Sequence, residues 1–269
     1  MSVASNPSPM MAMSEPSDPK PSGAFHWTQE PWGRALRCTA LPVSHFFTSS
    51  DVVLRDSERE WDAVAASLGV ARDRLLLVKQ VHGVDVAVAR RGGDRHWSRP
   101  QADIVITDDP SVAIGVRVAD CAPILLYDRV RNVAGAVHAG WRGTAARAAP
   151  AGVRALQREF GSHAADLVAA IGPCLGQCCG EIGPEVIDAF RIGGADPSSI
   201  EAWFTPGRGD RSLLDLERAN RDQLLQAGLD GDAIFASGLC TKTNPSRLHS
   251  YRAARDAAGR MLAAIRVAR

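Results

Sequence analysis

The sequence predicts a mixed α/β fold, and two patterns carry this prediction. Short runs rich in valine and isoleucine follow one another between residues 75 and 138, and amphipathic helical patterns dominate later in the chain. Many of the short runs are almost continuously apolar, which is typical of strands covered on both faces. With 269 residues, of which 45% are hydrophobic, the chain can bury a sizeable core.

The N-terminal segment has a different composition. Residues 1–23 contain six serines and five prolines and show no periodic apolar pattern. Such a segment cannot bury enough apolar surface to offset the entropy of ordering it. We therefore expect a disordered tail at 1–23 and a single domain at 24–269, with strand-like character from about Leu36 onward.

Seven later strands are expected from β-branched and leucine-rich runs that are bounded by turn residues. They lie at 75–78, 84–88, 103–107, 112–119, 124–127, 133–137 and 233–236.

Helical patterns are expected around Trp61 and at 151–160, 213–224 and 252–267. Gly161 and Gly228 should end the second and third of these helices, because glycine readily adopts the left-handed conformation found at helix C-termini. Residues 191–211 are rich in glycine, proline and serine, so we expect a long surface loop there.

Charge and cysteine content exclude several classes of protein. Thirty-one basic residues balance 30 acidic ones, which gives no electrostatic reason to expect a nucleic-acid or membrane partner. No apolar run approaches the roughly 18 residues of a membrane span, and no secretory signal is recognisable. Six cysteines in a chain of this length do not indicate a disulfide scaffold. These features favour a cytoplasmic protein with free thiols; they do not indicate an oligomeric state.

Three motifs place a metal-ligand residue directly after a strand-like run and just before a glycine or proline. His82 ends Lys-Gln-Val-His before Gly83, Cys121 lies in Ala-Asp-Cys-Ala-Pro, and His138 begins His-Ala-Gly-Trp-Arg-Gly. Any one of these residues alone is more typical of a structural role. Together they favour one metal site, because ligands at the ends of neighbouring strands can converge.

Zinc suits two imidazoles and one thiolate better than copper does. A blue-copper site would add a weak axial methionine, and none of the five methionines lies near these motifs in sequence. The chain also contains no His-x-His pair. Three protein ligands leave a fourth zinc position open for a water molecule, whose pKa zinc lowers towards about 7.

Residues beside the three motifs are candidates for catalysis and substrate binding. Asp120 or Asp103 could orient a ligand histidine or move protons, although capping a strand end is an equal alternative. Arg142 is placed to bind phosphate and Trp141 to stack on a base, while Lys79 could meet an anion. Each is also compatible with an ordinary structural or solvated role.

The cysteines at 174, 178 and 179 do not have zinc-ribbon spacing. We therefore expect them to belong to a structural loop that lines the pocket, rather than to a second metal site.

Together, the segments 79–83, 119–123 and 138–143 resemble those of the YfiH-like, laccase-domain family. Further similarity lies at 103–107, 171–174, 178–181, 215–220 and 250–252 with 259–260, so the resemblance covers roughly residues 36–267. The family is described both as purine nucleoside phosphorylases and as polyphenol oxidoreductases. The order and spacing of the motifs agree, which makes the resemblance specific.

The resemblance implies one domain of layered mixed sheets with helices outside. It also implies that His82, Cys121 and His138 hold zinc at the base of a pocket. The implied reaction is phosphorolysis of adenosine, inosine and S-methyl-5′-thioadenosine, with adenosine deamination as a second activity. The partners are then a purine nucleoside and phosphate.

Three departures from the family pattern affect substrate preference. The family's Gly-Gly-x-Ser segment and Asn-Leu pair are missing after Thr48, where the chain continues almost directly to Val52. Gly180 stands where tyrosine is usual. Ala253 stands where a second arginine is usual, and Arg255 could substitute for that arginine.

These residues suggest a mechanism as a hypothesis. Zinc, Arg142 and Arg252 would hold phosphate against C1′ of the ribose while the glycosidic bond breaks through a cation-like transition state. Deamination would use a metal-activated water at C6 of adenine, with Asp120 or a neighbouring group moving protons. Cys121 and His138 could act as catalytic groups in either reaction, although one pocket needs two binding orientations to present both C1′ and C6.

Other classes of function stay open. Cys121 could instead be a nucleophile with His138 as its base, which would give a metal-free thiol hydrolase or amidase. A copper polyphenol oxidase and a non-catalytic zinc protein are the remaining alternatives.

Overall fold

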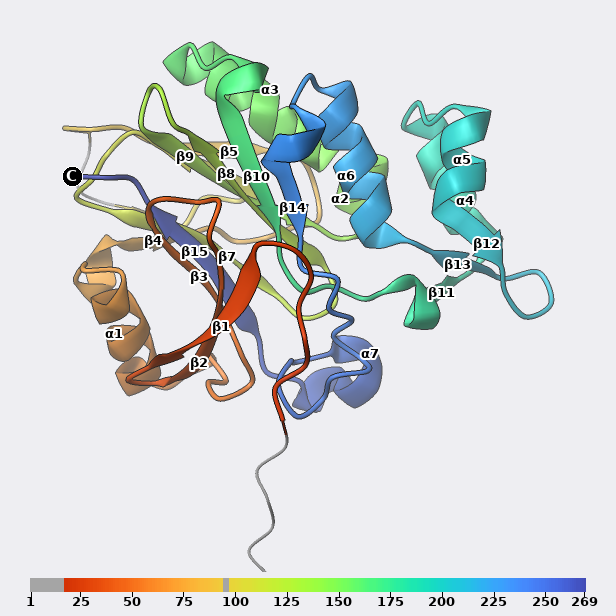
Figure 1. Ribbon diagram of the computed structural model, residues 1–269, viewed down its shortest axis with the longest axis horizontal. Coiled ribbons are helices and arrows are strands. Elements are labelled where there is room, and N and C mark those ends of the chain that lie inside the picture. The colour runs from red at the N-terminus through yellow and green to blue at the C-terminus, as the bar shows by residue number, and fades with distance from the viewer. Residues whose placement is uncertain (1–16, 94–96) are drawn as a thin grey trace, which may run out of the picture.

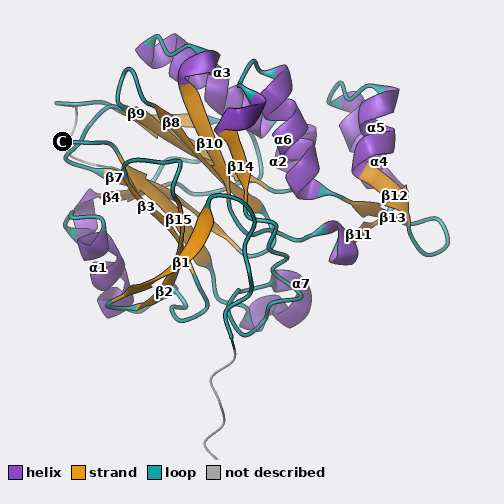
Figure 2. Cartoon of the chain, in the orientation of Figure 1, coloured by secondary structure: helices purple, strands orange, loops and turns teal. Residues whose placement is uncertain are grey.

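The computed structural model describes residues 17–93 and 97–269 and shows two large sheets stacked between helices (Figure 1). The first sheet has the strand order β1-β2-β3-β15-β7-β4, and the second has the order β14-β10-β8-β9-β6-β5. A third, three-stranded sheet has the order β11-β13-β12 and lies beside the main body (Figure 2). The predicted mixed α/β class with layered sheets is confirmed.

The first sheet consists of β1 (Phe25–Glu30), β2 (Gly33–Cys38), β3 (Ser44–Thr48), β15 (Met261–Arg266), β7 (Ala113–Val118) and β4 (Leu75–Leu77). Its neighbouring strands are antiparallel except for the parallel pair β4 and β7.

The second sheet consists of β14 (Ile234–Ala236), β10 (Leu167–Ile171), β8 (Ala122–Asp128), β9 (Val133–Ala139), β6 (Ile104–Thr107) and β5 (Val86–Ala89). The outer pairs β10–β14 and β5–β6 are parallel, and the central pairs are antiparallel. The small sheet holds β11 (Glu181–Ile182), β12 (Phe204–Pro206) and β13 (Ser212–Leu214).

The helices are α1 (Glu58–Ser67), α2 (Trp141–Ala145), α3 (Ala148–Phe160), α4 (Pro184–Ile192), α5 (Pro197–Trp203), α6 (Leu216–Gln226) and α7 (Tyr251–Ala254). Local chemistry explains several of their ends. The Ser57 side chain caps α1, Asp215 caps α6, and Gly161 ends α3 in the left-handed conformation.

Three apolar clusters bind the layers together. One cluster fills the space between the two large sheets and includes Ile114, Leu125 and Ala263. A second lies between the outer face of the second sheet and α3 with α6, and a third lies between the first sheet and α1. Because both faces of the central part of each large sheet are covered, the strands between residues 75 and 139 are mostly apolar, as the sequence predicted.

The predicted C-terminal helix at 252–267 is wrong. Only Tyr251–Ala254 is α-helical, and Met261–Arg266 forms β15 in the middle of the first sheet. This strand pairs with β3 on one side and with β7 on the other, and all six of its residues are buried. Pairing with strands far away in sequence overrides the helical preference of its alanines, methionine and leucine.

The predicted surface loop at 191–211 is wrong in part. Asp196 and Pro197 begin helix α5, where the Asp196 side chain accepts a hydrogen bond from the Ser199 amide. Trp203 ends this helix, is fully buried and donates a hydrogen bond to Asp222 at 2.8 Å. Proline at the first helical turn was therefore a helix start signal rather than a loop signal.

The N-terminal boundary also needs correction. Of the predicted tail at 1–23, residues 1–16 lie outside the described part of the chain, so disorder there stays a prediction. Residues 17–23 contact the body: Asp18 forms ion pairs with Arg34 and Arg247, and the Ser22 amide donates to the Ser237 carbonyl. No helix among the described residues is both long enough and apolar enough to cross a membrane.

Candidate functional site

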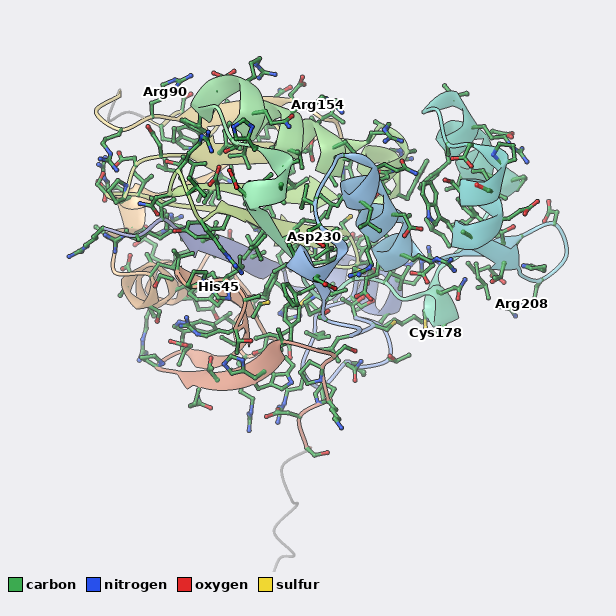
Figure 3. All side chains as sticks on the ribbon, turned by 45° about the horizontal axis from the view of Figure 1, so that its top comes forward. His45, Arg90, Arg154, Cys178, Arg208 and Asp230 are labelled. Carbon is green, nitrogen blue, oxygen red and sulfur yellow. The ribbon has the colours of Figure 1, made fainter. Side chains whose placement is uncertain are left out.

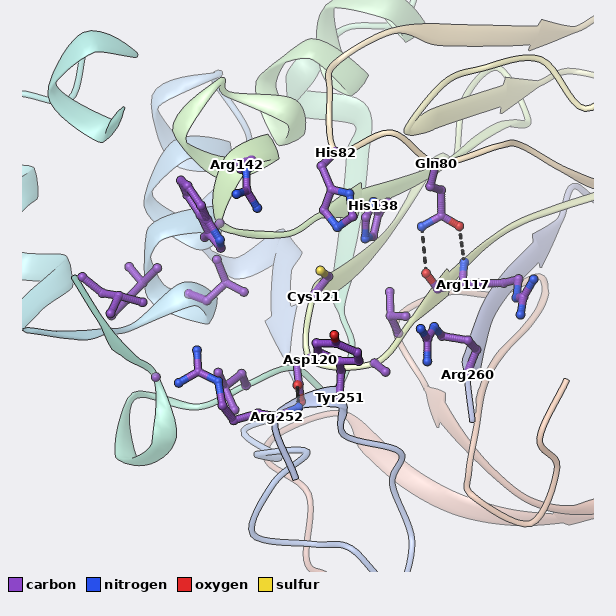
Figure 4. A pocket seen from close by; sticks show the side chains of 18 of the residues that line it. Gln80, His82, Arg117, Asp120, Cys121, His138, Arg142, Tyr251, Arg252 and Arg260 are labelled. Carbon is purple, nitrogen blue, oxygen red and sulfur yellow. Dashed lines mark hydrogen bonds between the residues drawn. The ribbon is translucent and has the colours of Figure 1, made fainter. Parts of the chain in front are cut away.

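The side chains of His82, Cys121 and His138 meet at one point. One ligand atom from each residue lies within 4.8 Å of the other two, and the two imidazole centroids are 4.9 Å apart. Figure 4 shows the three side chains pointing towards one another at one wall of a pocket. The sequence motifs that predicted this convergence are 39 and 17 positions apart, so only the fold brings them together.

Each side chain is delivered by the end of a strand or by the turn beside it. His138 lies in β9 opposite Pro123 of β8, and Cys121 directly precedes β8. His82 lies between β4 and β5 with a positive φ of 64°, and Asp120 has a φ of 87°. Backbone in this left-handed region is costly for residues other than glycine and persists only where the surroundings impose it, often at functional sites.

The buried carboxylate of Asp103 supports the left-handed backbone at His82. It accepts hydrogen bonds from the amides of Val81, His82 and Gly83 at 3.1, 2.9 and 2.7 Å. The same carboxylate contacts His138 Nδ1 at 2.7 Å. Asp103 therefore holds one histidine through its ring and the other through its backbone, and it leaves His138 Nε2 as the free nitrogen. Asp103 was one of the two carboxylates that the sequence suggested for orienting a ligand histidine.

The electrostatics of the cluster favour an ionised thiol. Burial raises the pKa of Cys121, but hydrogen bonds with His138 and His82 outweigh it and lower the pKa to about 6. Burial lowers the pKa of His138, but contacts with Asp103 and Cys121 raise it to about 9. For Asp103, burial raises the pKa and the His138 and backbone hydrogen bonds bring it below its ordinary value. These shifts favour a thiolate beside an imidazolium in the metal-free cluster.

Gly140 is required for the approach of these side chains. A Cβ atom at this position would lie 2.6 Å from Cys121 Sγ and 3.3 Å from His82 Cδ2. The φ of Gly140 is −69°, which any residue can adopt, so the requirement is for space and not for backbone freedom. The glycine that the sequence marked as a turn residue thus clears room around the sulfur.

The donor set fits zinc. Donors around one zinc ion are separated by roughly 3.3–3.8 Å, so small side-chain rotations would let one ion contact all three residues. The cluster combines two imidazoles with a thiol that ionises readily. None of the described residues that line the pocket is a methionine. A blue-copper centre would place one near the axial position.

The cluster lies in a pocket of about 730 Å³ with a strongly cationic lining. The basic residues that line the pocket are Lys79, Arg99, Arg117, Arg142, Arg252, Arg255 and Arg260. A volume in this range accommodates a drug-sized or nucleoside-sized ligand. The excess of basic side chains favours a ligand that carries negative charge.

The predicted substrate-binding residues line this pocket. Arg142 stacks on Trp141, with its guanidinium carbon 4.1 Å from the ring centroid, at the start of α2. Arg252 donates to the Glu181 carbonyl at 2.9 Å and lies across the pocket from Arg142 (Figure 4). Lys79 lies in the segment that leads to His82. The structure brings these groups together, and their roles stay predictions.

Asp120 has a different environment from the one expected for a proton carrier. Its two carboxylate oxygens accept hydrogen bonds from the Thr241 hydroxyl at 2.6 Å and from the Arg252 amide at 2.5 Å. Both partners belong to the segment that follows β14. These contacts favour a role in joining that segment to the motif around Cys121; the catalytic role stays a prediction.

Several lining residues were missed by sequence reasoning. The Gln80 side chain forms two hydrogen bonds with the backbone of Arg117, at 2.7 and 2.8 Å. These bonds join the segment that leads to His82 to strand β7. Arg117 lies inside β7 and gave no local signal. Tyr251 and Arg260 belong to segments that were noted in the sequence but were given no role.

The sequence departures also have a structural context. A Cβ atom at Gly180 would lie 2.6 Å from the Leu214 carbonyl oxygen, so a side chain there would force the neighbouring backbone to move. Arg255 lines the pocket near Tyr251, with its guanidinium carbon 5.8 Å from that ring. Its position agrees with the expectation that it could replace the arginine that is missing at Ala253.

The cysteines at 174, 178 and 179 were expected to belong to a structural loop and not to a second metal site, and the structure gives them a partner, Cys240, that the sequence did not indicate. Cys174 is buried and pairs through its backbone with Cys240, while Cys178 and Cys179 approach the Cys240 side chain instead. The loop does line the pocket, through Leu175 and Gly180. The partner residue was missed because Cys240 is about 60 positions away in the sequence.

Comparison with known proteins identifies related chains. A family model described as multi-copper polyphenol oxidoreductase laccase matches residues 53–268. Purine nucleoside phosphorylase YlmD of Geobacillus stearothermophilus is 35% identical over 208 residues, which cover 75% of each chain. A purine nucleoside phosphorylase of Deinococcus radiodurans is 37% identical over 75% of this chain and 74% of its own. Adenosine deaminase RL5, from an unknown prokaryotic organism, is 34% identical over 75% of this chain and 79% of its own.

Two solved structures share the fold. YlmD from Geobacillus stearothermophilus has a TM-score of 0.79 and 28% identity, with 90% of this chain and 99% of that chain covered. The hypothetical protein YfiH of Bacillus licheniformis also has a TM-score of 0.79, with 27% identity and coverage of 87% and 96%.

Proposed function

Because this chain belongs to the multi-copper polyphenol oxidoreductase laccase family, whose YfiH and YlmD structures share its fold, we propose that it is a zinc-dependent purine nucleoside phosphorylase. Its substrates are adenosine, inosine and S-methyl-5′-thioadenosine, which it converts with phosphate to the free base and a pentose 1-phosphate. Adenosine deamination is a second activity. Relatives named for purine nucleoside phosphorylase and for adenosine deaminase support a purine-processing enzyme. We place it in the cytoplasm.

The observation that carries the proposal is the donor cluster at the wall of a cationic, nucleoside-sized pocket. His82, Cys121 and His138 are the zinc ligands. Zinc, when bound, supplies a Lewis acid and positive charge to the pocket. Asp103 orients His138 and shapes the His82 turn, which is the kind of support that ligand histidines need.

Phosphorolysis requires that phosphate be held against C1′ of the sugar while the bond to the purine breaks. Arg142 and Arg252 face the pocket from different elements and bind the phosphate oxygens from two sides. Trp141 is held by its stacking with Arg142 and offers an apolar surface to the purine. Lys79 adds positive charge near the entrance to the cluster. Positioning and electrostatic stabilisation then supply most of the rate.

The direct test combines metal analysis with a product assay. The zinc-loaded protein is incubated with adenosine, with and without phosphate, and the products are separated by chromatography. We expect adenine, hypoxanthine and ribose 1-phosphate only when phosphate is present, and inosine in the sample without phosphate. If zinc-loaded protein forms neither adenine nor inosine, the enzyme proposal fails and a non-catalytic zinc protein is favoured.

His82→Asn is the variant of choice, because asparagine tolerates the positive φ at this position better than alanine does. It should lose both zinc and activity. His163→Ala is the matched control, since His163 is exposed in a turn outside the pocket. If His82→Asn retains full activity without zinc, the metal-dependent mechanism is wrong.

One observation favours a second candidate, a metal-free thiol hydrolase or amidase. The Cys121 thiol has a pKa of about 6 and contacts His138, which Asp103 orients, so the three groups resemble a nucleophile, a base and its orienting acid. If the chelator-treated protein keeps its full activity on adenosine, and alkylation of Cys121 then abolishes that activity, this candidate is supported. Loss of activity on chelation and recovery with zinc would support the phosphorylase. Oxidation of a phenol by the copper-loaded protein would support the oxidase.

A further inference from the structure

A second group of sulfur atoms lies outside the pocket. Cys178 and Cys179 belong to the 3₁₀ turn Gln177–Cys179, and Cys240 follows β14. Cys178 is exposed, Cys179 is half-buried and Cys240 is buried, so the group leads from solvent towards the interior. Figure 3 shows Cys178 on the turn next to β11, at the edge of the molecule.

The three sulfur atoms are spaced as metal ligands are. All lie within 4.8 Å of one another, and the Cys178 and Cys179 sulfur atoms are 3.7 Å apart. In a tetrahedral thiolate site with metal–sulfur bonds of about 2.3 Å, the sulfur atoms are separated by about 3.8 Å. The spacing therefore matches an ion-sized gap, whereas a disulfide would require two sulfur atoms to approach to about 2.0 Å.

Backbone hydrogen bonds fix the two segments relative to each other. The Cys174 amide donates to the Leu239 carbonyl at 3.3 Å, and the Thr241 amide donates to the Cys174 carbonyl at 2.9 Å. This parallel bridge aligns Cys174 with Cys240 and so places Cys240 beside the turn that follows Cys174. The convergence of the thiols is built into the backbone and does not depend on flexible side chains alone.

Gly176 provides the space in which the sulfur atoms approach. A Cβ atom at this position would lie 2.9 Å from Cys240 Cβ, 3.4 Å from Cys240 Sγ and 3.5 Å from Cys178 Sγ. Its φ of −71° suits any residue, so glycine is needed here for clearance. Gly140 has the same relation to Cys121 in the pocket.

The close approach of the thiols also shifts their pKa values. Burial raises the pKa of Cys240, but backbone hydrogen bonds from Thr243 and Gly176 bring it below its ordinary value. Burial and the hydrogen bonds with Cys240 and Cys179 raise the pKa of Cys178 to about 12.

We propose that Cys178, Cys179 and Cys240 form a second metal site, separate from the pocket, for a thiophilic d¹⁰ cation. An all-sulfur donor set selects zinc or monovalent copper over magnesium and calcium. Each thiol that is protonated before binding releases its proton to solvent as its sulfur–metal bond forms, and no oxidant or reductant is consumed. The proposed reaction in the pocket uses none of these residues.

The bound ion would join two segments that support the pocket. Thr241, next to Cys240, donates to the Asp120 carboxylate, and the Leu175 amide donates to the Asp120 carbonyl at 2.8 Å. Asp120 precedes Cys121. The second site is therefore placed to stiffen the segments that position the first site, without contributing a ligand to it.

Cobalt titration of the full chain tests the proposal. The protein is reduced with a phosphine under anaerobic conditions, its six thiols are counted, and cobalt(II) is added while the sulfur-to-cobalt absorption is recorded. Wild type should bind two equivalents, and zinc and monovalent copper are then compared as competitors. A His82→Asn/Cys121→Ser variant should keep one equivalent with a strong thiolate band, because only the three-sulfur site remains.

The Cys178→Ser/Cys179→Ser variant should lose one of the two cobalt equivalents and most of the thiolate absorption. Cys174→Ser is the matched control from the same segment and should bind two equivalents. Gly176→Ala retains all three thiols and should weaken cobalt binding at this site about 10-fold through loss of clearance, while thermal unfolding of the metal-free protein confirms folding. Unchanged binding by the double serine variant, or no thiolate band in His82→Asn/Cys121→Ser, would overturn the proposal.

Discussion

The two sulfur-containing clusters of this protein are built in different ways. The cluster of His82, Cys121 and His138 rests on strand ends of the large sheets and on the buried carboxylate of Asp103. The cluster of Cys178, Cys179 and Cys240 rests on a short turn and a backbone bridge, with no carboxylate among its described hydrogen-bond partners. In both clusters one donor is exposed, one is half-buried and one is buried.

This difference indicates different chemistry. A mixed nitrogen and sulfur set that is oriented by a buried acid and opens into a pocket suits catalysis, because it keeps a position for a reactant. An all-sulfur set on a surface turn suits structural binding of a soft ion. A glycine clears space in each cluster, so close approach of donors does not by itself distinguish a catalytic site from a structural one.

The largest expected effect is the loss of a donor from the pocket cluster. Cys121→Ser should abolish zinc binding there and lower kcat/KM for adenosine phosphorolysis by more than about 100-fold, which exceeds the 10–100-fold typical of losing a supporting residue. Metal analysis and product chromatography measure both effects. Cys38→Ser, at a buried cysteine outside both clusters, should retain zinc and activity. Equal losses in both variants would show that the effect is general destabilisation.

The reactivity of the metal-free thiols should separate the clusters next. The Cys121 pKa of about 6 predicts that its alkylation rises through pH 6 and levels off above it, whereas the raised pKa of Cys178 keeps that exposed thiol largely protonated at pH 7. At pH 7 the thiolate fraction of Cys121 is about 30-fold that of an ordinary cysteine of pKa about 8.5. Mass spectrometry of the alkylated peptides measures this order. Faster modification of Cys178 would contradict it.

The same shifts set the pH dependence of stability in the metal-free protein. The lowered pKa of Cys121 contributes stability that is lost as pH falls through about 6, and the raised pKa of His138 contributes stability that is lost as pH rises through about 9. The extra unfolding free energy of wild type over Cys121→Ser should therefore be greatest between pH 6 and 9. Denaturant unfolding across this range checks the window, and a difference independent of pH would argue against the ion pair.

Removal of the supporting carboxylate should weaken one cluster only. Asp103→Asn should reduce zinc affinity at the pocket by roughly 10–100-fold, and it should lower the unfolding free energy by about 1–3 kcal/mol, because buried amides lose a charged acceptor. Asp128→Asn is the matched control, since Asp128 is also fully buried and accepts the amides of Val130 and Arg131 far from the pocket. It should cost similar stability but leave both cobalt equivalents bound. Loss of zinc affinity in both variants would remove the special role of Asp103.

The smallest expected effect comes from filling the cleared space at Gly140. Gly140→Ala should weaken zinc binding at the pocket about 10-fold. The new methyl group would lie 2.6 Å from Cys121 Sγ, so the sulfur atom must move away by up to about 1 Å. Binding at the three-sulfur cluster should not change, which is the reverse of the result expected for Gly176→Ala. The two variants are compared by cobalt titration. Equal effects of both variants on both sites would contradict the assignment of separate ligand sets to the two clusters.

The sequence predicted well those features that depend on local pattern. The strands at 104–107, 113–118 and 122–128 were visible as β-branched runs, and the helix that ends at Gly161 was visible from its periodicity and its terminating glycine. The three metal-ligand candidates were visible because each combines a donor residue, a preceding strand and a following turn residue. Their meeting is a property of the fold.

Features that depend on distant partners were not visible. Met261–Arg266 has the composition of a helix and became a central strand because β3 and β7 offered it backbone partners on both sides. Cys240 had no local motif, and its backbone bridge with Cys174 places its thiol beside those of Cys178 and Cys179. Arg117 reached the pocket from within β7, which carries no functional signature, and Gln80 lies in the first histidine motif but was given no role.

The sequence by itself thus determined the mixed α/β class, the order of the strand-like runs and the residues able to bind a metal, because hydrophobic period, turn chemistry and donor type are written locally. Only the tertiary structure decided which donors share a site and which acid supports them. It also decided which cysteines meet and where the C-terminal segment lies. These depend on pairing between residues tens to hundreds of positions apart, and burial in the layered core selects that pairing over local preference.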